Sequence, residues 1–77
     1  MTDEEIYKKY DSKTIVLMVL AGMDIKVISH AEKFIHTEGN YVIELEKGRL
    51  YKLLQNNQVI APFHDVVDLC SFIKNGL

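Results

Sequence analysis

The sequence predicts an α+β domain built as two N-terminal helices, a three-stranded antiparallel β-meander and a C-terminal helix, in the order α-α-β-β-β-α. The stretch Tyr41–Ala61 alternates in polarity around two turn signals, which is typical of a meander. In the segments before and after this stretch, apolar residues recur at spacings of three and four, which is typical of helices. With 77 residues, the chain (1–77) is expected to be a single compact domain.

The first helix is expected to begin at Thr2–Glu5, where Thr2 and Glu5 form a capping box in an acidic first turn. The next stretch, Thr14–Met23, is apolar all round, so periodicity does not separate a buried helix from a buried strand. β-Branched residues at its start favour a strand, whereas Leu17 and its neighbours favour a helix. We prefer a helix, and one this apolar is expected to be central to the core or to a dimer interface.

Residues Ile25–His36 are expected to form a further helix, with Asp24 as its N-cap. This prediction rests on a stripe of apolar residues at helical spacing: Val27, Ile28, Ala31, Phe34 and Ile35. Gly39 is the expected left-handed residue just beyond its end.

The meander takes its register from its two turns. Lys47-Gly48 and Asn56-Asn57 tolerate positive φ, so we treat both as two-residue hairpin loops. Glu46 then lies opposite Arg49, and Leu53 lies opposite Ile60.

Alternation along these strands assigns one apolar face to the core: Tyr41, Ile43, Leu45, Leu50, Lys52, Leu54, Val59 and Ala61. The opposite, outer face carries charge near the first turn but gathers Val42, Tyr51, Leu53 and Ile60 at its far end. Either a helix of this chain covers that cluster, or another chain docks on it. A slip of one residue in either turn would move a whole strand's side chains to the other face.

The last helix is expected to start at the N-cap Asp65 and to end at Gly76. Its buried stripe is Val66, Leu69, Cys70 and Ile73.

Composition excludes several classes of protein. The net charge of −2, with both signs scattered, gives no basic face for nucleic acid or an anionic membrane. The acidic start is unlike a secretory signal, and the run Ile15–Ala21 is too short to span a bilayer. One cysteine allows no intrachain disulfide. We therefore expect a cytoplasmic protein.

Candidate chemistry is sparse. His30 and His36 are six positions apart, so on a helix they would point away from each other rather than share a metal ion. Cys70 lies on an apolar stripe, where a cysteine behaves as a small buried hydrophobe. The glycines are isolated and form no phosphate-binding loop. We expect no catalytic, cofactor-binding or metal-binding residues.

These observations favour a non-enzymatic protein–protein interaction module, such as an adaptor, inhibitor or small subunit. Its partner would be a second copy, forming a homodimer, or another protein, with Val42, Tyr51, Leu53 and Ile60 at the interface. The alternative is a nucleic-acid-binding regulator that uses the Glu46–Lys52 hairpin as a wing. A small enzyme with a site shared between chains would have only His64 and Asp65 as candidates.

Overall fold

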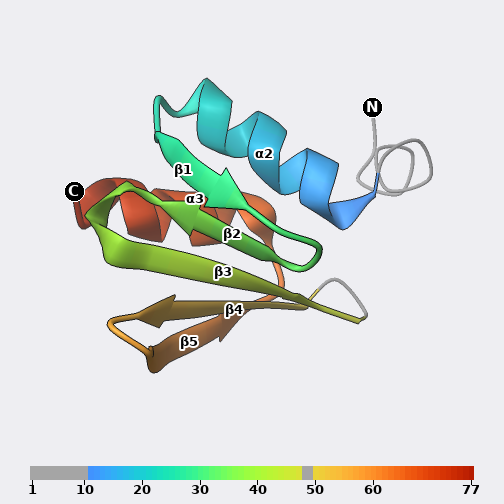
Figure 1. Ribbon diagram of the computed structural model, residues 1–77. Helices are drawn as coiled ribbons and strands as arrows, with labels where there is room; N and C mark the ends of the chain where they lie inside the picture. Colours follow the sequence, from blue (N-terminus) through green and yellow to red (C-terminus); the bar gives the residue numbers. More distant parts are fainter. Residues whose placement is uncertain (1–10, 48–49) are drawn as a thin grey trace.

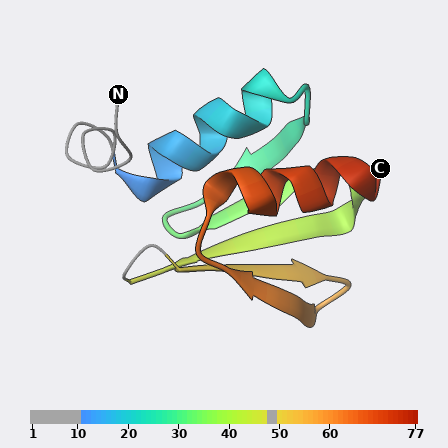
Figure 2. The same cartoon turned by 180° about the vertical axis from the view of Figure 1, so that it is seen from behind.

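In the part of the chain that the structure describes, an antiparallel sheet carries two helices on one of its faces (Figures 1 and 2). The computed structural model describes residues 11–47 and 50–77. Its elements are α2 (Ser12–Gly22), β1 (Val27–His30), β2 (Phe34–Thr37), a 3-10 turn (Glu38–Asn40), β3 (Tyr41–Glu46), β4 (Leu50–Gln55), β5 (Gln58–Phe63) and α3 (Val66–Asn75). The five strands follow one another in the sheet in chain order.

The predicted element order is therefore wrong, although an α+β fold with an antiparallel sheet is confirmed. One helix precedes the strands among the described residues, and the sheet has five strands rather than three. The helix start at Thr2–Glu5 lies outside the described residues.

The segment predicted as the helix Ile25–His36 is the hairpin of β1 and β2. Its turn is closed by the N–H of Ala31, which donates to the carbonyl of Phe34 at 2.8 Å. At the open end, Lys26 and Glu38 are joined by a 2.9 Å backbone hydrogen bond and by the Lys26 N–H, which donates to the Glu38 carboxylate at 2.8 Å. Asp24 lies in the link after α2 and has a left-handed backbone conformation, with a φ of 58°. It does not cap a new helix.

α2 confirms the preference for a helix over Thr14–Met23. Its N-cap is Asp11, whose side chain accepts a 2.7 Å hydrogen bond from the Thr14 N–H, and this bond lowers the pKa of Asp11. Leu20 on α2 is fully buried, whereas Met18 is 53% exposed and Leu17 is half-buried. The helix thus presents one side to the core rather than lying inside it.

The second half of the chain contains the three predicted strands, β3 to β5. The Asn56-Asn57 turn is confirmed, because both residues have positive φ (53° and 66°) and Gln55 pairs with Gln58. The first turn is longer than predicted: Glu46 pairs with Leu50 rather than with Arg49, which leaves residues 47–49 between the strands.

That extra residue exchanges the two faces of β4. Leu53 now lies opposite Ile43, and Tyr51 lies opposite Leu45, on the face that meets the helices. Leu50, Lys52 and Leu54 lie on the outer face instead of in the core.

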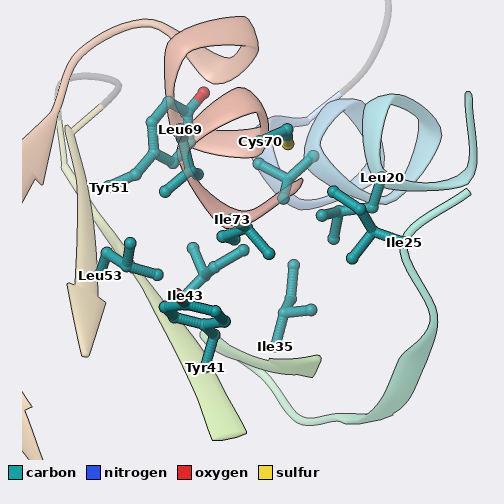
Figure 3. Close-up of a cluster of buried hydrophobic side chains, with 11 residues drawn as sticks. Leu20, Ile25, Ile35, Tyr41, Ile43, Tyr51, Leu53, Leu69, Cys70 and Ile73 are labelled. Carbon is teal, nitrogen blue, oxygen red and sulfur yellow. The ribbon is translucent and has the colours of Figure 1, made fainter. Parts of the chain in front are cut away.

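The core fills the space between the sheet and the two helices (Figure 3). Sheet residues contribute Ile35, Tyr41, Ile43, Tyr51 and Leu53, and the helices contribute Ile15, Val16, Leu20, Leu69, Cys70 and Ile73. Ile25, in the link between α2 and β1, is also buried. The predicted ends of α3 are confirmed. The Asp65 side chain caps the helix by accepting hydrogen bonds from the Val67 and Asp68 N–H groups, and Gly76 follows its last residue.

Among the described glycines, Gly39 is the one with a positive φ. Its φ is +80°, and a Cβ there would lie 2.7 Å from Leu77 Cδ2 and 3.1 Å from the Tyr41 ring. We expect Gly39→Ala to lower the free energy of unfolding by about 1–3 kcal/mol, through strain and crowding. Gly22→Ala is the matched control, because a Cβ at Gly22 would meet nothing within 4 Å.

Thermal or urea unfolding measures both variants. At the end of α2, Gly22→Ala is expected to be neutral or to stabilise by up to about 1 kcal/mol. Equal stability of the two variants would show that the turn after β2 does not depend on a glycine at position 39.

Candidate functional site on the outer face of the sheet

The face of the sheet that points away from the helices is the candidate site, and we call it the outer face (Figures 1 and 2). Directly opposed residues of antiparallel strands share a face, so the pairing places its side chains in rows that cross the strands. The first row consists of Ser29, His36, Val42, Leu54 and Val59. The second consists of Phe34, Glu44, Lys52 and Pro62.

The first row is mainly apolar and lies open. Val59 is 57% exposed and Phe34 of the neighbouring row is 36% exposed, while Val42 and Leu54 are half-buried. A hollow of about 310 Å³ is lined by Phe34, His36, Val42, Leu54 and Asn57. A second, of about 320 Å³, shares His36, Val42 and Asn57 with it. No helix or strand of the described residues covers this surface.

The second row carries charges of both signs. Glu44 lies directly opposite Lys52, and the Lys52 ammonium is 3.3 Å from the Glu46 carboxylate. The hydrogen bond from Lys52 lowers the pKa of Glu46 below its ordinary value. The outer face therefore combines an apolar row with a row that holds one pair of opposed charges, Glu44 and Lys52.

Both edges of the sheet are unsuited to pairing with a further strand. β1 has four residues and an irregularity between Val27 and Ser29, and β5 has one opposite Leu53 and Leu54. Pro62 also lies in β5. Short edge strands, bulges and proline hinder strand addition, so contact with another chain is favoured at the outer face rather than at an edge.

The four predicted interface residues do not lie together. Val42 is on the outer face, and Ile60, the extra residue of the β5 irregularity, is 38% exposed. Tyr51 and Leu53 are fully buried and point into the core (Figure 3). Their assignment to the outer face was wrong, because it depended on the length of the first turn.

Sequence reasoning missed Phe34, Leu54 and Val59 as residues of the outer face. A three-residue first turn places Leu54 opposite Val42, and the Asn56-Asn57 turn then places Val59 beside Leu54. Three-residue loops are among the next most common hairpin connections after two-residue ones. Turn length was thus the signal that would have identified Leu54 and Val59.

The remaining candidates for chemistry lie apart from this face or carry structural roles. Cys70 is fully buried, which confirms the prediction of a buried hydrophobe, and this burial raises the pKa of its thiol to about 12. The Asp65 carboxylate caps α3, and His64 beside it is exposed. Among residues 11–47 and 50–77, no three His, Cys, Asp or Glu side chains gather to hold a metal ion.

None of the helices in the described part of the chain is long and apolar enough to cross a membrane.

Comparison with protein-family models, with curated proteins and with solved structures found no match to this chain. The case for a function therefore rests on the surface described above.

Proposed function

We propose that the protein is a non-enzymatic interaction module that binds a protein chain through the outer face of its sheet. The observation that carries this proposal is the apolar row Val42–Leu54–Val59, flanked by Phe34 and left open by the described residues. Contiguous apolar patches on a protein surface mark interaction sites more often than scattered apolar residues do.

The surroundings of this row suit a protein partner. Interfaces combine an apolar centre with a polar rim. Here Glu44 and Lys52 lie on one side of the row, Asn57 lies on the other side, and His36 lies beside Val42 at the β2 end of the row. A chain of 77 residues also has a small core, and such domains often gain stability from association. Both arguments favour burial of the outer face in a complex.

Nucleic acid is the weaker proposal. Phosphate binding requires free cations, whereas Lys52 is paired with Glu46 and lies opposite Glu44. Lys47 is exposed, and Arg49 lies outside the described residues. No feature of the described surface favours the hairpin as a wing.

A photo-crosslinking amino acid tests the proposal. Placed at Val59, which is 57% exposed on the outer face, it is expected to form a covalent adduct with a protein, in the purified protein alone or in the cells that produce it. The matched control is the same amino acid at Val67, which is 51% exposed on α3. No adduct is expected there.

The mass of the adduct identifies the class of partner. Twice the mass of the chain indicates a second copy, and any other mass indicates a different protein. The absence of any adduct at Val59, or equal adducts at both positions, would contradict binding through the outer face.

A further inference from the structure

We propose that the chain docked on the outer face is a second copy of this protein, related by a two-fold axis that runs parallel to the strands between β3 and β4. This inference rests on the proposed function and specifies its partner. It makes the complex a β-sandwich in which the two helical layers lie outside and the two sheets meet inside.

The opposed charges of the second row determine the axis. Two identical faces can pack together only around a two-fold axis that lies in the plane between them. Glu44 on β3 and Lys52 on β4 are directly opposite each other. One such axis places Glu44 above the copy of Lys52 and Lys52 above the copy of Glu44. It is the line that follows the strands and bisects the pair. Glu44 of each copy then meets Lys52 of the other.

The same axis matches the apolar residues. Val42 on β3 is directly opposite Leu54 on β4. Val42 of one copy therefore lies above Leu54 of the other copy, close to the axis. Farther out, Phe34 on β2 lies above Pro62 on β5, and His36 lies above Val59. Four of the five strands are covered, and β1 stays outside the contact.

Charge also disfavours the nearest alternative. An axis along β3 would place Glu44 above its own copy, and like charges in direct opposition are destabilising. The axis between β3 and β4 replaces that repulsion with two attractions. The arrangement is thus complementary to itself in both charge and polarity.

The covered area predicts a weak dimer. The covered strands are β2 with four residues and β3, β4 and β5 with six each, and together they cover roughly 350 Å² in projection, from the usual strand spacing and rise. This is below the roughly 600 Å² or more that standard specific interfaces bury on each partner, and it is in the range of weak, transient contacts. We expect dissociation at about micromolar concentrations, so the mass in solution should depend on protein concentration.

Charge reversal tests the axis. Glu44→Lys and Lys52→Glu should each weaken self-association by about tenfold or more, because each substitution acts twice in a two-fold dimer. An equal mixture of the two variants should form a heterodimer, since the lysine introduced at position 44 of one chain meets the glutamate introduced at position 52 of the other. The double variant Glu44→Lys/Lys52→Glu should dimerise like the wild type. Sedimentation over a roughly hundredfold range of concentration measures all four.

The single reversals separate the two axes. With an axis along β3, Glu44→Lys would exchange two facing glutamates for two facing lysines, and Lys52 would lie above Phe34, so neither single reversal would weaken dimerisation. Lys74→Glu on α3 is the matched control, and its dimerisation should be unchanged. A wild type that stays monomeric, or single reversals that dimerise normally, would overturn the inference. If the wild type is monomeric but the Val59 crosslinker captures a protein of another mass, the second copy is excluded and the interaction module stands. If no adduct forms at all, both proposals fall.

Discussion

Leu53→Ala is expected to lower the free energy of unfolding by about 2–5 kcal/mol, while Leu54→Ala should lower it by about 1 kcal/mol or less. The two leucines are neighbours on β4 and face opposite ways. Leu53 is fully buried opposite Ile43, so its truncation leaves a cavity between the sheet and α3. Leu54 is half-buried on the outer face, where solvent fills the space that its side chain leaves.

Urea unfolding at low protein concentration measures both variants without a contribution from association. Equal m-values for the two variants are the control, because they show that both unfold from the same fold. A larger loss for Leu54→Ala would restore the register with a two-residue first turn, and would place Tyr51 and Leu53 on the outer face after all.

The length of that one turn decides how much of the candidate site was predictable. Alternation within β3 was interpreted correctly, since Tyr41 and Ile43 share the core face and Val42 lies on the other. Within β5 it was wrong, because the irregularity at Ile60 puts Val59 on the outer face while Ala61 lies on the core face. The phase of one strand relative to the next depends on the connection between them. The residue types Lys47-Gly48 are compatible with a two-residue loop and equally compatible with part of a longer loop. One residue of difference therefore moved Tyr51 and Leu53 from the predicted interface into the core.

The hairpin of β1 and β2 was missed for a different reason. Its strands have four residues each, which is too short for a period of two to show clearly. Val27 faces the core, Ile28 is 65% exposed and Ile35 is buried, so their helical spacing was accidental. The β-branched side chains of all three favoured strand, and this local preference was the better guide.

Features set by local chemistry were predictable. Asp65 and Gly76 delimit α3, and the Asn56-Asn57 turn needs only two residues that tolerate positive φ. These features depend on contacts within a few residues along the chain. The faces of β4 depend on register, which such contacts do not determine.

Leu20→Ala is expected to lower the free energy of unfolding by about 2–5 kcal/mol, whereas Met18→Ala on the same helix should change it by no more than about 0.5 kcal/mol. Leu20 is fully buried within the hydrophobic core, together with Ile25 and Cys70. Met18 is 53% exposed, and alanine is at least as good a helix former as methionine.

This pair tests which side of α2 meets the sheet, a question that its uniformly apolar sequence left open. Circular dichroism provides the control. Both variants keep the Asp11 cap, so their helix content should be equal. A large loss from Met18→Ala would show that the exposed side of α2 is buried in the protein in solution. In that case α2, rather than the outer face of the sheet, would be the first surface to examine for a partner, and the crosslinker belongs at Met18.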